Sequence, residues 1–154
     1  METMGSFRNS LCLVLLLALL QPANADNWPR FRGENGNGIA YAKTVPARWS
    51  VEDFRWAIEL PGTGHSSPVI WDKRVFVTSA DKTAGQRFVS CHSTDDGAEV
   101  WRKTVDYHSY KAHKNNSQAS NTPAVDADHV YVLFQSKASS PLIAFDHDGS
   151  SRHG

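Results

Sequence analysis

Two stretches of the chain repeat each other 55 residues apart, and this repeat constrains the fold more than any other feature. The first is Ser-Pro-Val-Ile at 67–70 with Arg-Val-Phe-Val at 74–77, and the second is Thr-Pro-Ala-Val at 122–125 with His-Val-Tyr-Val at 129–132. Self-similarity at such a period is typical of arrays in which each unit buries its apolar face against a neighbour. The chain holds about two units, so we expect one unit to pack on the other.

The second half of the unit also repeats, although less closely. Residues 89–97 align with residues 142–149, with one residue dropped before the glycine. The turn at Gly97 leads into a strand that carries Trp101. This pattern predicts a turn followed by a tryptophan-bearing last strand in each unit.

Two incomplete units flank this pattern. A similar tryptophan-bearing run, 54–60 with Trp56, precedes the first repeat. We interpret it as the last strand of a unit whose other three strands are absent. After Gly149 a histidine, His153, stands where the tryptophan belongs. We therefore expect the last strand of the second unit to be missing.

The first 25 residues read as a secretory signal. Arg8 precedes a ten-residue apolar run, 11–20, which is followed by Ala-Asn-Ala at 23–25. A membrane span needs about 20 apolar residues, so this run is too short to be an anchor. We expect cleavage after Ala25, a mature chain without a transmembrane anchor, and a periplasmic or secreted location.

Charge and cysteine content exclude several classes of protein. Without the signal, fifteen Lys and Arg residues balance fifteen Asp and Glu residues, so no basic excess favours nucleic acid as a partner. Cys91 is the one cysteine left after cleavage, and no intramolecular disulfide can form. Its alternation with Val89 favours a small buried apolar side chain over a reactive thiol.

The mature chain divides into an irregular lead-in at 26–53 and β-rich repeats at 54–154. The repeats consist of a first unit at 54–105, a polar loop at 106–120 and a partial second unit at 121–154. Val, Ile, Phe, Tyr and Trp runs between turn residues predict strands near 54–60, 66–70, 74–79, 87–93, 99–105, 121–125, 129–135 and 141–146. No window has helical apolar periodicity, which predicts an all-β fold.

Four short antiparallel strands per unit, with a tryptophan near each unit's end, favour β-propeller blades over a sandwich. Ser-Ser-Pro-Val-Ile at 66–70 and Asp-Gly-Ala-Glu-Val-Trp at 96–101 resemble the repeats of pyrroloquinoline-quinone-like (PQQ-like) β-propellers. That group includes quinoprotein dehydrogenases and the propeller lipoprotein of outer-membrane protein assembly. The segments 28–38 and 116–123 are similar to those of exported propeller proteins of planctomycete-like bacteria. The resemblance implies about two blades of an incomplete propeller, as in an N-terminal fragment.

The resemblance also implies a role for the tryptophans. In such propellers the last-strand tryptophan docks between neighbouring blades, and an indole suits this position because it is large and offers one N–H to a carbonyl. Trp56 and Trp101, with Gly97 in the turn, are therefore structural blade-docking candidates. The alternative is that these rings form a stacking platform for a quinone or a sugar.

The polar loop supplies the other candidates. Loops on a rigid scaffold are where binding residues gather, so His108, Tyr110 and His113 are loop-binding candidates, although their spacing matches no metal template. The glycine-rich run at 33–38 is interpreted as a plain turn. His65 and Ser66 could form a nucleophile pair, but adjacent side chains on a strand point to opposite faces.

Three functions remain open. The first is an exported, non-catalytic scaffold that binds a protein or cell-surface partner through its blade loops. The second is an oxidoreductase that uses PQQ and calcium, which the resemblance suggests, although the chain has neither a neighbouring-cysteine pair nor a carboxylate cluster with Asn for calcium. The third is a truncated product without independent activity. Two open blades leave strand edges exposed, so we also expect sluggish folding or self-association.

Overall fold

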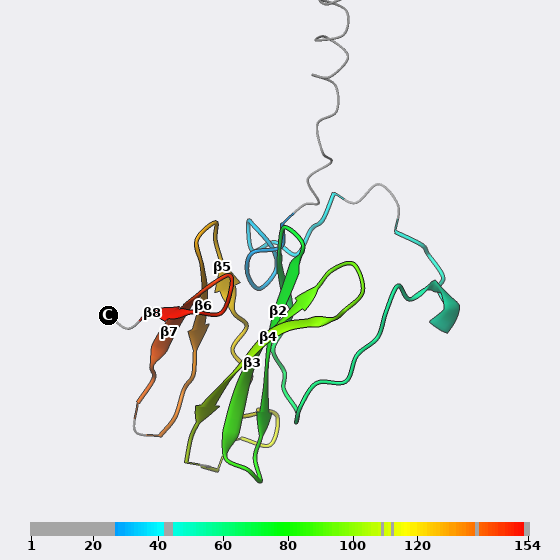
Figure 1. Ribbon diagram of the computed structural model, residues 1–154. Coiled ribbons are helices and arrows are strands. Elements are labelled where there is room, and N and C mark those ends of the chain that lie inside the picture. The colour runs from blue at the N-terminus through cyan, green and yellow to red at the C-terminus, as the bar shows by residue number, and fades with distance from the viewer. Residues whose placement is uncertain (1–26, 42–44, 109, 112, 138, 153–154) are drawn as a thin grey trace, which may run out of the picture.

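The computed structural model describes residues 27–41, 45–108, 110–111, 113–137 and 139–152. These residues form two four-stranded antiparallel sheets, and the single helical element is a 3-10 turn, η1 (Val51–Asp53) (Figure 1). The all-β prediction is confirmed. Among the described residues no helix has the length and apolar character that crossing a membrane requires. The predicted signal at 1–25 lies outside them.

The first sheet contains the strands of the first unit in chain order. They are β1 (Val69–Trp71), β2 (Arg74–Asp81), β3 (Gln86–Ser93) and β4 (Glu99–Asp106). Phe76 pairs with Cys91, which pairs with Trp101, so these three side chains share one face. Tight turns at positive-φ residues, Asp72 and Gly97 among them, join the strands.

The second sheet repeats this order with shorter strands. They are β5 (Ala124–Val125), β6 (His129–Leu133), β7 (Leu142–Asp146) and β8 (Ser151–Arg152). The expectation that its last strand is missing is wrong. Gly149, with φ +87°, donates its N–H to the carbonyl of Asp146, and this turn returns the chain alongside β7 for two residues. The turn sequence suffices for the hairpin without the tryptophan.

The prediction of a strand at 54–60 is also wrong. These residues lie outside every strand of the structure. None of the backbone N–H and C=O groups of 55–61 has a backbone hydrogen-bond partner among the described residues. A strand exists only through its ladder with a neighbour, and side-chain contacts alone hold this segment on the first sheet.

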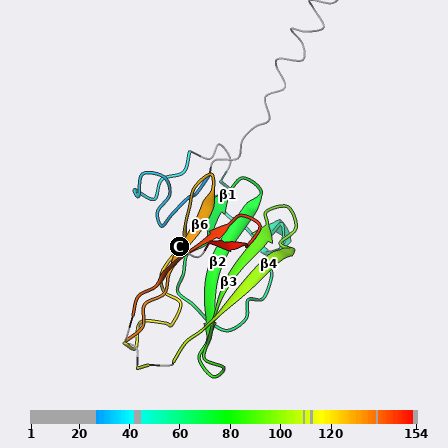
Figure 2. The same cartoon turned by 60° about the vertical axis from the view of Figure 1, so that its left-hand side comes forward.

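The core lies between the two sheets, which face each other (Figure 2). The first sheet contributes Val69, Phe76, Val89, Cys91 and Trp101, and the second contributes Val125, Val130, Val132 and Phe145, with Phe134 just after β6. The Trp101 and Phe145 rings lie 6.0 Å apart between centroids across this interface. One shared core therefore fixes the two sheets relative to each other.

The lead-in covers the outer edges of β1 and β5. Trp28 exchanges two backbone hydrogen bonds of 2.9 Å with Ile70, and the carbonyl of Pro29 accepts the N–H of Val125 at 2.8 Å. Gly33 adopts φ +76° under the Trp28 ring, where a β-carbon would lie 2.7 Å from the indole. Two exposed edges that could pair with other chains are thereby blocked.

Candidate functional site

The structure places each predicted docking tryptophan on the glycine of a turn. The Trp56 ring lies against Gly97, and its Nε1–H donates to the carbonyl of Thr94 at 2.9 Å. The Trp101 ring lies against Gly149, and its Nε1–H donates to the carbonyl of His147 at 2.8 Å. The same contact occurs twice, once from the 54–60 segment onto the first sheet and once from the first sheet onto the second.

The two ends of the sheets differ in charge. We call the end with the described residues of 62–68, 82–85, 107–108, 110–111, 113–123, 134–137 and 139–141 the loop end, and it lies at the bottom of Figure 1. We call the end with the short turns 72–73, 94–98, 126–128 and 147–150 the turn end. The loop-end segments contain four lysines, and two aspartates, Asp81 and Asp106, stand at the adjoining ends of β2 and β4. The turn-end segments contain six aspartates and one lysine, and Arg74 begins the adjoining β2. The loop end is therefore the more positive of the two ends, although the chain is neutral overall.

A cavity of about 400 Å³ lies at the loop end, where three segments meet. Thr63 and His65 come from the segment before β1, Lys82 comes from the β2–β3 turn, and the polar loop supplies the remaining wall. The cationic and imidazole side chains around it are His65, Lys82, Lys111, His113 and Lys114. None of the three lysines forms an ion pair within the described part of the chain, so the cavity favours an anionic partner.

A second loop-end cavity, of about 250 Å³, lies between the end of β4 and the β6–β7 connection. Arg87 is one of its lining residues and is only 2% exposed. The Arg87 Nε donates to the carbonyl of Gln118 at 2.7 Å, which fixes the polar loop to the sheet. His108 and Lys137 lie on its wall.

The three predicted loop residues do not form one site. His113 lines the larger cavity and His108 the smaller one. The Tyr110 hydroxyl donates to the carbonyl of Gln135 at 3.0 Å, and the Tyr110 carbonyl accepts from Gln118 Nε2 at 2.9 Å. Tyr110 thus connects the polar loop to the β6–β7 connection.

Sequence reasoning missed Arg87 and the lysines of the larger cavity. Arg87 alternates with Val89 and Cys91, so it occupies a core-facing position of β3. A cation at a core-facing position is unusual, and this pattern could have marked Arg87 as a functional candidate. The lysines are far apart in sequence, and only the meeting of three segments brings them together.

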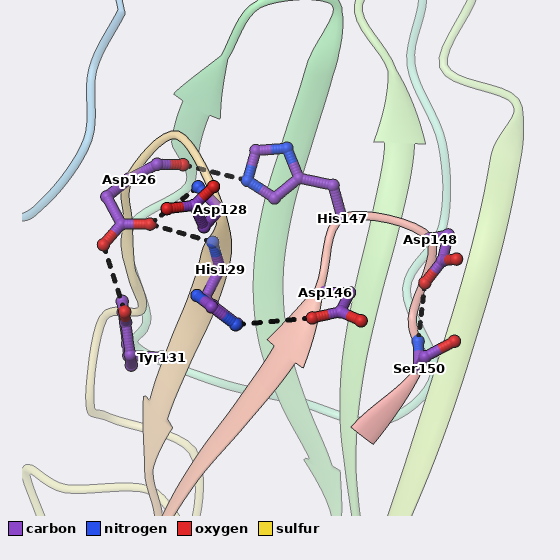
Figure 3. Close-up of polar contacts among 8 residues, drawn as sticks. All are labelled: Asp126, Asp128, His129, Tyr131, Asp146, His147, Asp148 and Ser150. Carbon is purple, nitrogen blue, oxygen red and sulfur yellow. Dashed lines mark hydrogen bonds and ion pairs between the residues drawn. The ribbon is translucent and has the colours of Figure 1, made fainter. Parts of the chain in front are cut away.

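The turn end carries a polar cluster on the second sheet (Figure 3). One carboxylate oxygen of Asp126 accepts the N–H groups of Asp128 and His129, and the other accepts the Tyr131 hydroxyl at 3.0 Å. These two backbone N–H donors hold the pKa of Asp126 below its usual value. His129 Nε2 lies 3.4 Å from an Asp146 carboxylate oxygen.

Ligand atoms of Asp126, Asp128 and His129 lie within 4.8 Å of one another, which is a spacing that could hold a cation. Both oxygens of Asp126 already accept hydrogen bonds that close the β5–β6 turn. A cation would have to compete with these bonds, so the cluster stabilises the turn in this structure.

His147 connects that cluster to the first sheet. Its Nε2 lies 2.9 Å from the Asp126 carbonyl (Figure 3). Its ring centroid lies 5.7 Å from that of Phe76. Its own carbonyl accepts from Trp101 Nε1 and from Arg74 Nη1. The turn end therefore joins the two sheets, as Arg87 does at the loop end, and the loop end also carries the cavities described above.

Comparison of the chain with protein-family models and with curated proteins found no match.

Proposed function

We propose that this protein is an exported, non-catalytic scaffold built of PQQ-like β-propeller blades, and that it binds an acidic protein or cell-surface partner through its loop end. The charge separation between the two ends is the observation that carries the binding half of this proposal. A lysine-rich end on a neutral molecule attracts acidic partners and orients them toward the cavities.

The repeated tryptophan contact supports the blade half of the proposal. Trp56 on Gly97 and Trp101 on Gly149 are two copies of one docking geometry, as expected for tandem blades. Each sheet has four antiparallel strands in chain order, which is the organisation of a blade. PQQ and calcium remain the alternative that the sequence resemblance suggests.

Retention on an immobilised acidic polysaccharide, polygalacturonate, tests the binding proposal. We expect the triple variant Lys82→Glu, Lys111→Glu, Lys114→Glu to lose retention at about 0.15 M salt, where surface charges still act over roughly 8 Å. The control is Arg48→Glu, Arg55→Glu, Lys73→Glu, which makes the same net-charge change at exposed positions away from the loop end. Equal loss in both variants would show that only net charge matters and would reject the loop-end site.

We also propose self-association, with a second copy of the chain as the occupant of the outer face of the second sheet. Tyr131 and Leu133 lie on this face and are the repeat equivalents, 55 residues later, of Phe76 and Thr78. In the first sheet, Phe76 and Thr78 are almost completely buried beneath the second sheet. On the second sheet the equivalent face is open, with Leu133 41% and Leu142 67% exposed. The unpaired backbone of 55–61 offers a second copy a strand partner.

A further inference from the structure

Arg87 is a buried cation without a carboxylate partner. It is 2% exposed, and no Asp or Glu lies within ion-pair distance of it in the part of the chain that the structure describes. Its guanidinium carbon lies 4.3 Å from the Tyr107 ring centroid and 5.1 Å from that of Phe134. Buried charges in proteins are normally paired, so the missing counter-charge needs an explanation.

Backbone carbonyls meet part of this requirement. The Arg87 Nε donates to Gln118 and Nη2 donates to Gln135, which explains why the side chain holds two loops in place. Carbonyl oxygens carry only partial charge, and a guanidinium has five N–H donors. This anchoring role therefore leaves the other N–H donors of Arg87, a residue that lines the cavity, without a hydrogen-bond partner among the described residues.

The neighbouring tyrosine is also incompletely satisfied. The Tyr107 hydroxyl is buried and has no hydrogen-bond partner among the described residues. Burial raises the pKa of Tyr107, so the hydroxyl keeps its proton at neutral pH and remains a donor. A buried hydroxyl without a partner is costly, and the Arg87 anchoring role does not account for it.

Both groups line the same cavity of about 250 Å³. Its wall also includes Lys137, His108, Ser136 and Ser139. The Ser136 hydroxyl donates to the Ser139 carbonyl and accepts the Ser139 N–H, so Ser139 is the serine whose hydroxyl suits a ligand. One acidic residue, Asp106, lies on the wall, and its carboxylate accepts from Gln86 Nε2 at 3.4 Å. Pro141 and Val105 supply apolar surface. The donors thus outnumber the acceptors around a space that suits a ligand of about monosaccharide size.

We propose that this cavity binds the carboxylate of a small hydroxylated acid, of the sugar-acid class. The guanidinium group of Arg87 and the Tyr107 hydroxyl are suited to a carboxylate, and the Ser139 hydroxyl is suited to a hydroxyl group of the ligand. The inference deepens the proposed function, since it names a chemical group that the loop end would take from an acidic surface.

Calorimetric titration and thermal melting of the full chain with D-glucuronate test this inference, with D-glucose as the neutral match and inorganic phosphate as the other anion, all at constant ionic strength. We expect saturable binding of glucuronate and a melting temperature that rises with its concentration. Glucose should do neither. Absence of saturable glucuronate binding, or equal stabilisation by glucose, would overturn the proposal, as would binding of phosphate alone.

The variant Tyr107→Phe removes the unpartnered hydroxyl and keeps the ring beside Arg87. We expect at least fivefold weaker glucuronate binding, with an unliganded melting temperature equal to or above that of the parent. Tyr41→Phe is the control, because that side chain is 80% exposed in the lead-in, outside both cavities. Undiminished binding in Tyr107→Phe would reject the site. Tyr107→Phe is also tested for retention on polygalacturonate. If it is retained while its glucuronate binding is weakened, the lysine-rich cavity binds the polymer independently of this site.

Discussion

The indole of Trp101 lies directly on Gly149: a β-carbon at Gly149 would stand 2.9 Å from Trp101 Cδ2. Glycine at this position thus permits both the left-handed backbone, φ +87°, and the approach of the ring. The contact joins the last long strand of the first sheet to the final turn of the second.

Gly149→Ala should destabilise the protein by about 2–4 kcal/mol, because it adds a clash with the indole to the roughly 1–2 kcal/mol cost of a left-handed alanine. Gly38→Ala is the matched control. Gly38 also has positive φ, +76°, but nothing lies within 4 Å of a β-carbon there. Urea unfolding of both variants measures the loss in the free energy of unfolding. Equal losses in the two variants would show that the contact of the Trp101 ring with Gly149 does not add to stability.

Cys91 should make stability fall at alkaline pH. Burial raises the pKa of its thiol from 9.0 to about 11, with Arg74 opposing the shift. Because the pKa of the Cys91 thiol is higher in the folded than in the unfolded chain, the protonated thiol contributes fully to folding stability below about pH 9. This contribution is lost as the pH rises toward 11. The loss should reach roughly 2–3 kcal/mol. Urea unfolding of the Cys12→Ala protein, in which Cys91 is the one remaining cysteine, measures this loss from pH 8 to 11. With Cys91→Ala added, the free energy of unfolding should change less with pH over this range.

The same burial should protect the thiol from reagents. At pH 8 an alkylating agent should modify Cys91 in the Cys12→Ala protein only after urea unfolds the chain. Mass spectrometry of native and urea-unfolded samples measures the extent of Cys91 alkylation. Rapid modification in the native state would show that the core opens around Cys91.

Leu142→Lys should weaken self-association. Leu142 is 67% exposed on the outer face of the second sheet, where a charge opposes burial by a second copy. The control is Ile39→Lys, at a 58% exposed apolar position of the lead-in, outside both sheets. Sedimentation velocity over a concentration series should show association in the parent and the control but less in Leu142→Lys. A monomeric parent at all concentrations would contradict the proposal.

Much of the sheet structure was predictable from local sequence. The Val- and Phe-rich runs between turns that contain Asp or Gly indicated seven of the strands near their observed positions. Such runs fit a pleated surface, and Asp72, Gly85, Gly97 and Gly149 supply the positive φ of the turns. The segment 54–60 has the same composition but lacks a ladder, and composition cannot show whether a neighbouring strand is present. β8 shows the converse, since a turn alone sufficed to form it.

The candidate sites were less predictable. His108 and His113 attracted attention as loop histidines, yet they line separate cavities. The chemistry of the smaller cavity depends on Arg87 and on the unpartnered Tyr107 hydroxyl, and lack of a partner is a three-dimensional property. Sequence indicated that loops would carry function, but not which side chains would meet there.

Hydrogen exchange of the indole N–H protons, followed by NMR, tests the packing of the two sheets most directly. Trp56 and Trp101 donate to turn carbonyls, whereas Trp49 is 66% exposed. We predict slow exchange for the Trp101 indole, intermediate or slow exchange for Trp56 and fast exchange for Trp49. If the Trp101 indole proton exchanged as fast as that of Trp49, the two sheets would not be joined by this ring.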